Sequence, residues 1–168
     1  MRDRHPTPAV PPEVGAGLQI AVIAASWHAP ITDALLAGAL QALEDLDVVA
    51  PTTVRVPGAF ELPVAATQLA RSGLDALVCL GTIIRGETAH FDVLCHAVAI
   101  GLIEVTTRTG VPIGFGVLTC DDAEQAAQRA GAGGGRANEG YDAAWAAVAT
   151  ASSLRSADWS ARPARRPS

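Results

Sequence analysis

The chain has 168 residues and is 49% hydrophobic, which is enough apolar material for one domain with a sizeable core. Its formal net charge is −5 and its basic residues are scattered, which argues against a nucleic-acid-binding surface. All twelve basic residues are arginines, so mechanisms that need a lysine Schiff base or a P-loop lysine are excluded.

The cysteine pattern bears on metal binding and on cellular location. Cys79, Cys95 and Cys120 lie far apart and form neither a CxxC motif nor the Cys/His spacing of a zinc site. We therefore expect small core residues rather than metal ligands, and a reducing, cytoplasmic location. We also expect neither a signal peptide nor a membrane-spanning stretch, and hence no membrane partner.

The first half of the chain alternates strand and helix patterns. Residues 1–16 contain four closely spaced prolines, and we expect them to form a flexible arm. Residues 18–25 have the composition of a buried parallel strand, and residues 31–46 have the apolar spacing of a helix. Residues 48–56 predict a second strand, and residues 60–71 a second helix.

The second half continues the alternation. Residues 76–81 predict a buried strand, 82–88 a polar turn, and 91–108 a helix whose apolar positions recur at helical spacing. Residues 111–119 predict a fourth strand. They are followed by a short helix at 122–130, a glycine-rich loop at 131–138 and an alanine-rich helix at 141–155. The tail from residue 157 is expected to be disordered.

Four strands alternating with helices predict an α/β fold. We expect three layers (α/β/α), with a four-stranded parallel sheet in a flavodoxin-like doubly wound topology, over residues 17–156. Ligands of such sheets bind beyond the carboxyl ends of the strands. The loops that follow the strands are therefore expected to gather at one edge: residues 26–28, 58–61, 82–90 and 119–121.

Several residues in and near these loops have both a structural and a ligand-binding interpretation. Trp27 is either a packing residue or a platform on which a planar ring stacks. Glu61 either stabilises the start of its helix or accepts hydrogen bonds from a ligand. Arg85 is either half of an ion pair or, with N–H groups at the next helix start, part of an anion site. His90, at that helix start, is placed to exchange protons and competes with His28 and His96 for that role. By sequence alone, Arg129 is a solvated helix residue.

Five stretches occur in order over nearly the whole folded part: ASWH (25–28), VPGAFELP (56–63), GTIIRGETAHFD (81–92), GVLT (116–119) and EQAAQRAG (124–131). In this combination the chain resembles the lumazine synthase family. That family condenses 5-amino-6-(D-ribitylamino)uracil with 3,4-dihydroxy-2-butanone 4-phosphate to 6,7-dimethyl-8-ribityllumazine, releasing phosphate and water, in riboflavin biosynthesis. The resemblance implies a transferase without metal or cofactor, because the substrate's own amine is the nucleophile.

The resemblance also implies roles for individual residues. His90 takes the position of the family's proton-transfer histidine. The residues expected to bind the pyrimidine ring and the ribityl chain are Trp27, Ala59, Phe60, Glu61, Thr82, Ile83, Ile84 and, reaching from a neighbouring subunit, Phe115. The residues expected to bind the phosphate group are Arg85, Gly86, Glu87, Thr88 and Arg129.

One position departs from the family pattern. Before Gly140 the family usually has a lysine close to the phosphate end of the site, whereas this chain has Glu139, which reverses the charge. Arg136 is a candidate for compensating that reversal. The departure leaves a second function open, a flavin- or lumazine-binding protein on the same scaffold without turnover. A flavodoxin-like electron carrier is a third reading, which does not explain His90 and Arg129.

An assembly is expected on two grounds. The resemblance implies a ring of five copies, alone or as two stacked rings, with active sites at subunit boundaries and riboflavin synthase as a candidate partner. The sequence adds that residues 143–148 make the closing helix apolar nearly all round, which favours a covered surface. The proline-rich arm and the loop at 132–138 favour the smaller assembly over a sixty-subunit shell.

Overall fold

The computed structural model describes residues 10–131 and 138–157, and the structural statements below concern these residues. They form one sheet of four strands in the order β2-β1-β3-β4. The strands are β1 (Ile20–Ala25), β2 (Thr52–Val56), β3 (Ala76–Ile84) and β4 (Ile113–Cys120). Every neighbouring pair is parallel, and β2 and β4 are the two edges of the sheet.

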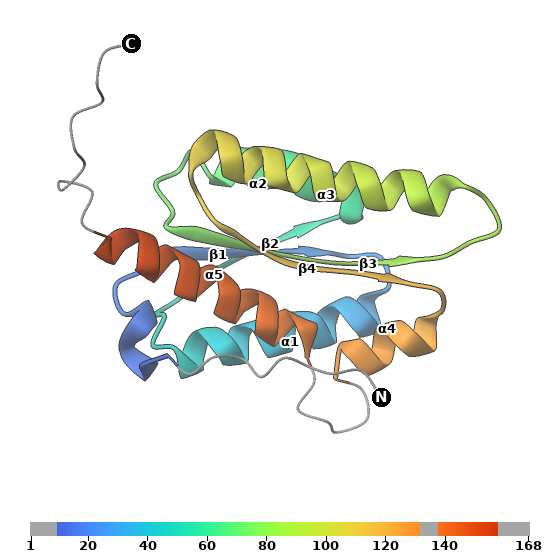
Figure 1. The fold of residues 1–168 in the computed structure, drawn as a ribbon. Helices are drawn as coiled ribbons and strands as arrows, with labels where there is room; N and C mark the ends of the chain where they lie inside the picture. The colour runs from blue at the N-terminus through green and yellow to red at the C-terminus, as the bar shows by residue number, and fades with distance from the viewer. Residues whose placement is uncertain (1–9, 132–137, 158–168) are drawn as a thin grey trace, which may run out of the picture.

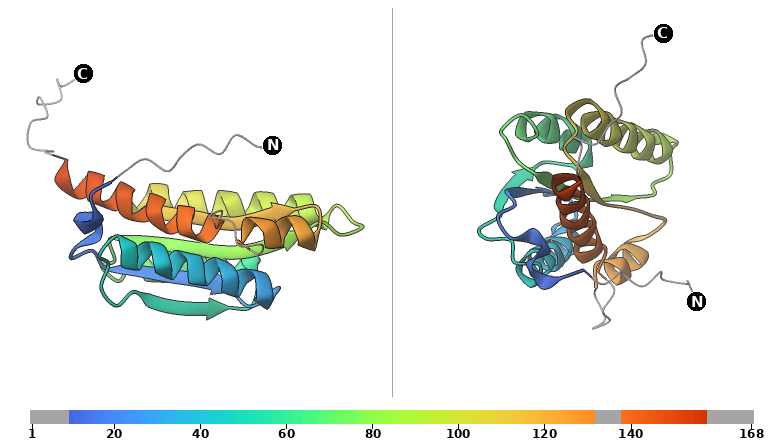
Figure 2. Two further views of the ribbon diagram at one scale, coloured as in Figure 1. Left: turned by 90° about the horizontal axis from the view of Figure 1, so that it is seen from below. Right: turned by 60° about the vertical axis from the view of Figure 1, so that its left-hand side comes forward.

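Helices cover both faces of the sheet (Figure 1; Figure 2). One face carries α1 (Ala29–Asp45), α4 (Ala123–Arg129) and α5 (Glu139–Ser156). The other carries α2 (Leu62–Leu69) and α3 (His90–Thr109). Two short 3-10 helices, η1 (Pro12–Gly15) and η2 (Ala59–Glu61), precede β1 and α2. This arrangement confirms the predicted three-layer α/β/α fold with a doubly wound parallel sheet.

The sheet divides the hydrophobic core into two layers. Successive side chains of a strand point to opposite faces, and both central strands are buried because helices cover each face. Val78 and Leu80 of β3 therefore pack in the layer beneath α1 and α5, whereas Leu77 and Cys79 pack in the layer beneath α2 and α3. This two-sided burial explains the uncharged run of residues 76–81.

Two predicted boundaries were wrong. The turn expected at Thr82 begins only at Arg85, because Thr82, Ile83 and Ile84 continue β3 in register with residues 118–120 of β4. The second strand begins at Thr52 rather than at residue 48, since Asp47 and Ala50 have positive φ angles and the chain turns there. Both errors come from contacts and backbone angles that an apolar pattern does not encode.

Three expectations lie partly or wholly outside the described residues. They concern residues 1–9 of the proline-rich arm, most of the glycine-rich loop (132–137, including Arg136) and the tail from residue 158. The described end of the arm includes η1, where the N–H of Gly15 donates to the carbonyl of Leu46 at 2.9 Å. Val14 packs against the core layer beneath α1 and α5.

The expectation that the closing helix leaves an apolar face uncovered was wrong. In α5, Ala143, Ala144, Ala147 and Val148 are all buried inside the chain. The helix lies directly on β4: a Cβ atom added to Gly114 would stand 2.0 Å from the carbonyl oxygen of Ala143. Small residues on both elements allow this approach, so the apolarity of α5 serves the core of this chain and gives no reason to expect an assembly.

Most of the exposed large apolar side chains of the described helices lie instead on the opposite layer. Large apolar side chains with more than half of their surface exposed include Val64 of α2 and Val93 and Ile103 of α3. Among the described helices, α3 alone is long and apolar enough to cross a membrane, which is weak evidence by itself. Phe91, Val98 and Leu102 of α3 are buried against the sheet, so the exposed apolar side chains of this helix lie on the side that faces away from the sheet.

Candidate active site

The loops after β1 and β2 are joined by backbone hydrogen bonds at the carboxyl edge of the sheet. The N–H of Ser26 donates to the carbonyl of Val56 at 2.8 Å, and that of Trp27 donates to the carbonyl of Pro57 at 3.0 Å. The loops reach this edge together because β1 and β2 are neighbouring parallel strands. Sequence reasoning predicted this convergence, and the structure confirms it for the first two loops.

Trp27 lies over the turn that follows β2. Its ring packs on Gly58, yet 64% of the side chain is exposed, which leaves an indole surface available for a planar ligand. Glu61 has a structural partner: its Oε2 accepts a hydrogen bond from the N–H of Gly58 at 2.9 Å. The helix-start interpretation of Glu61 is therefore confirmed, and its contact with a ligand stays a prediction. Next to it, Ala59 is buried and Phe60 is exposed.

The end of β3 projects beyond its neighbour β1. Pairing with β1 ends at Ala24 and Leu80, whereas pairing with β4 continues to Ile84 and Cys120. Over residues 82–84 the backbone of β3 therefore has a partner strand on one side only. Backbone N–H and C=O groups on the other side are free of the sheet, which suits recognition of a heterocycle edge by main-chain groups. The buried Oγ1 of Thr82 also has no hydrogen-bond partner among the described residues.

Arg85 is held at the head of the exposed loop that leads to α3. Its Nε donates to Oδ1 of Asp121 at 3.0 Å, and its Nη1 lies 3.4 Å from both carboxylate oxygens of Asp92. The guanidinium carbon stands 4.1 Å from the centroid of the Phe91 ring. Hydrogen bonds to Asp121 and Asp92 raise the pKa of Arg85. These contacts confirm the ion-pair interpretation, and a direct role in phosphate binding stays a prediction.

The loop itself offers backbone groups at a helix N-terminus. Gly86, Glu87, Thr88 and His90 are all exposed, and α3 begins at His90. The N–H of His90 lies 3.4 Å from Oγ1 of Thr88. First-turn N–H groups without an intrahelical acceptor favour an anion. The arrangement can bind a phosphate group and place a histidine beside it.

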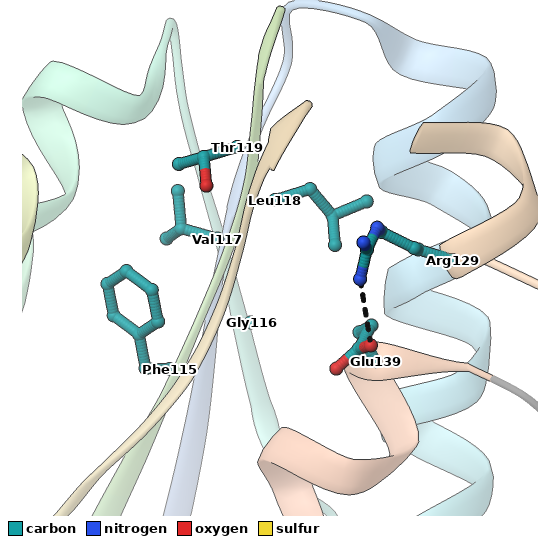
Figure 3. A pocket seen from close by; sticks show the side chains of 7 residues that line it. All are labelled: Phe115, Gly116, Val117, Leu118, Thr119, Arg129 and Glu139. Carbon is teal, nitrogen blue, oxygen red and sulfur yellow. Dashed lines mark ion pairs between the residues drawn. The ribbon is translucent and has the colours of Figure 1, made fainter. Parts of the chain in front are cut away.

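A second group of predicted residues lies at the edge strand β4. Arg129, at the end of α4, and Glu139, at the start of α5, point toward each other with Nη1 3.7 Å from Oε1 (Figure 3). Phe115 lies on the other side of β4 and is 48% exposed. A cavity of about 400 Å³ runs along this edge; its lining residues are Phe115, Gly116, Val117, Leu118, Thr119, Arg129 and Glu139.

Trp27 and Phe60 do not meet Phe115 within one chain. Trp27 and Phe60 follow β1 and β2, whereas Phe115 lies on β4, and β2 and β4 are opposite edges of the sheet. Sequence reasoning placed the strand-end loops correctly, and it assigned Phe115 to a neighbouring subunit through the resemblance alone. It missed Asp92 and Asp121 as partners of Arg85. The signal available was an acidic residue in the first turn of a helix and another directly after a strand. No group of three or more potential metal ligands is present in the described part of the chain.

Comparison with known proteins agrees with this fold and these loops. The family model described as 6,7-dimethyl-8-ribityllumazine synthase matches residues 17–155. A protein of that name from Streptomyces coelicolor is 55% identical over 139 residues, covering 83% of this chain and 86% of the relative. Those from Kineococcus radiotolerans and Paenarthrobacter aurescens are 57% identical over 141 residues and 51% identical over 144 residues. They cover 84% and 86% of this chain, and 88% and 89% of the relatives. On this evidence the chain belongs to the 6,7-dimethyl-8-ribityllumazine synthase family.

Proposed function

We propose that this chain is a transferase that condenses 5-amino-6-(D-ribitylamino)uracil with 3,4-dihydroxy-2-butanone 4-phosphate, forming 6,7-dimethyl-8-ribityllumazine and releasing phosphate and water. The observation that carries the proposal, beyond family membership, is that three features follow the carboxyl ends of neighbouring parallel strands. They are the ring of Trp27 after β1, the one-sided end of β3 and the start of α3 with His90. These are the three functions the reaction needs: ring binding, main-chain recognition and proton transfer.

The chemistry assigned to the chain is orientation and proton transfer. The pyrimidine stacks on Trp27 and meets main-chain groups at residues 82–84, while residues 86–88 hold the phosphate at the start of α3. Holding two substrates side by side converts a bimolecular step into a unimolecular one. The 5-amino group of the pyrimidine attacks the carbonyl carbon of the butanone with loss of water, and phosphate is then eliminated. The ribitylamino nitrogen closes the second ring with loss of another water, and His90 transfers protons in these steps.

We further propose that the complete site forms between two copies of the chain. Apolar hollows lie on both sides of α3. One, next to α2, is lined by residues that include Phe60, Val64 and Gly101, and the other, next to β4, by residues that include Ile103 and Phe115. Two different patches on one subunit favour a head-to-tail contact, and such a contact forms a ring when the rotation between neighbouring copies closes. Such a contact would carry Phe115 and Arg129 of one copy toward Trp27 and Phe60 of the next.

The size of the ring and its partners are proposals that rest on the family resemblance. We propose five copies, as one ring or two stacked rings, in the cytoplasm. The lumazine product is the substrate of a riboflavin synthase, which makes that enzyme the candidate partner. The substrates are small molecules, and we propose no role for nucleic acid or membrane.

The experiment that tests the function is a steady-state assay with both substrates. Lumazine formation by absorbance and phosphate release should rise together in equal amounts. The ion pair between Arg129 and Glu139 favours one alternative, a lumazine-binding protein without turnover, because it occupies the cation assigned to the phosphate. That alternative is supported if lumazine binds but neither product accumulates.

A further inference from the structure

We propose that Glu139 is a built-in competitor for the phosphate group at Arg129, and that it weakens the binding of the phosphorylated substrate and of released phosphate. The inference rests on the proposed function, which assigns Arg129 to the phosphate end of the site. Its starting observation is the ion pair, in which Nη1 of Arg129 lies 3.7 Å from Oε1 of Glu139 (Figure 3). The two charged groups therefore face each other, and both remain partly exposed to solvent.

The two side chains are positioned by one asparagine between the helices that carry them. Oδ1 of Asn138 accepts hydrogen bonds from the N–H groups of Gly140 and Tyr141 at 2.8 and 3.2 Å, which caps the start of α5. Its Nδ2 donates to the carbonyl of Ala130 at 2.8 Å, directly after Arg129. Asn138 thus fixes the backbone on either side of the ion pair, so the fold holds Arg129 and Glu139 close to each other.

The charge balance of the cavity follows from this geometry. Among the described residues that line it, Arg129 is the only cation and Glu139 the only anion, so this described part of the lining carries no net charge. An anion that approaches Arg129 must either displace the Glu139 carboxylate or lie beside it and be repelled. With one long contact and side chains 32% and 40% exposed, the pair is weak enough to be opened by a dianion.

The expected effect is selective for one substrate. The phosphorylated butanone and inorganic phosphate carry the charge that competes with Glu139, whereas the pyrimidine does not. Exposed ion pairs contribute on the order of one kcal/mol or less, so removing the carboxylate should tighten phosphate binding by about two- to fivefold. The same competition speeds the loss of phosphate after turnover.

The test compares Glu139→Gln with Glu124→Gln, which removes the same charge from α4, where Glu124 is bonded to Gln128 rather than to Arg129. Inorganic phosphate is titrated calorimetrically, and KM is measured for both substrates. Glu139→Gln should lower the Kd of phosphate and the KM of the butanone phosphate by about two- to fivefold, and leave the KM of the pyrimidine unchanged. Glu124→Gln should change none of these constants. Glu139→Ala serves as a second variant if Glu139→Gln does not fold.

A double-mutant cycle separates competition from simple repulsion. In an Arg129→Ala background, Glu139→Gln should lose most of its effect on phosphate. The proposal is overturned if the effect of Glu139→Gln keeps its size without Arg129, or if phosphate affinity is unchanged in Glu139→Gln. Failure of the proposed function gives a different result, since a chain without turnover would still report the competition through the phosphate titration.

Discussion

Trp27 lies across Gly58 so closely that a Cβ atom added to Gly58 would stand 2.7 Å from Cε3 of the indole ring. The same glycine donates its N–H to Glu61 at 2.9 Å, so it joins the ring to the start of η2. A residue without a side chain is therefore what lets the indole rest on the turn after β2. The platform assigned to the pyrimidine is set by the neighbouring loop as much as by Trp27 itself.

Replacing Gly58 tests this relationship. In Gly58→Ala the methyl group must push the indole away from the turn, so we expect the KM of the pyrimidine to rise about tenfold and the tryptophan fluorescence to shift. Gly86, a glycine with open space around it, provides the control. A Cβ atom there would meet nothing within 4 Å, so Gly86→Ala should leave the tryptophan fluorescence unchanged. Unchanged pyrimidine KM in Gly58→Ala would remove Trp27 as the platform.

His90 is expected to be the proton-transfer residue. Removing a general acid–base group slows turnover on the order of 10²-fold, so His90→Ala should lower kcat by about that factor with an unchanged circular dichroism spectrum. His96, an exposed residue further along α3, supplies the matched control, and His96→Ala should retain kcat. A kcat within twofold of the unsubstituted chain would exclude His90 from the mechanism.

The ion pairs of Arg85 support a second role beside the phosphate contact implied by the resemblance, which is to position the loop between β3 and α3. Arg85→Gln removes the charge that holds Asp121 and Asp92, so residues 86–88 should lose their fixed place and the KM of the butanone phosphate should rise about three- to tenfold. Asp121→Asn should give a smaller change in the same direction, because the contact with Asp92 remains. If Arg85 bound the phosphate directly, Asp121→Asn would instead free the guanidinium and lower that KM.

Cys79 is expected to be inert in the folded chain. Burial raises the pKa of its thiol from 9.0 to about 12. Between pH 9 and about pH 12 the folded chain therefore keeps the thiol proton, whereas the unfolded chain loses it. The contribution of Cys79 to the free energy of unfolding is constant below pH 9 and declines as the pH rises toward 12. Iodoacetamide at pH 8 should label Cys79 only in denaturant, as read by mass spectrometry. Equal labelling rates with and without denaturant would contradict its place in the core.

How far the sequence could predict this molecule depends on which contacts are local. The strands, the helices and the edge where the loops gather follow from apolar period and parallel topology, and these predictions were confirmed. The end of β3 was misplaced because Thr82, Ile83 and Ile84 are strand residues only through pairing with β4. The burial of α5 was missed for the same reason, since Gly114 lies about thirty residues before the alanine that packs on it.

In the candidate site, too, local features could be predicted from the sequence and contacts between distant residues could not. Trp27, the loop at 86–88 and His90 stand in motifs that follow parallel strands, so their position after the carboxyl ends of those strands could be expected from the sequence. The ion pair of Arg129 with Glu139 joins two helices across a long loop, and no local pattern encodes it. Of the two partners of Arg85, Asp121 is likewise distant in sequence, thirty-six residues away, whereas Asp92 is seven residues away.

The last prediction concerns assembly. Its structural basis is the exposed apolar side of α3, because the apolar face of α5 is buried within the chain. Ile103 is 57% exposed beside the hollow that holds Phe115, and Val64 is 65% exposed beside the hollow next to α2. If the two hollows face each other in a ring, a charge at Ile103 is buried without a partner and breaks the contact.

Light scattering on the unsubstituted chain should give five or ten times the 17.2 kDa of one chain, and Ile103→Glu should give a mass near 17.2 kDa. Val49→Glu provides the control, because Val49 is 77% exposed but lies in the loop between α1 and β2. Activity should fall with assembly in Ile103→Glu, since Phe115 and Arg129 would no longer reach the neighbouring Trp27. A monomeric Ile103→Glu with full activity would show that one chain holds a complete site, and a megadalton particle would show that the assembly is a shell.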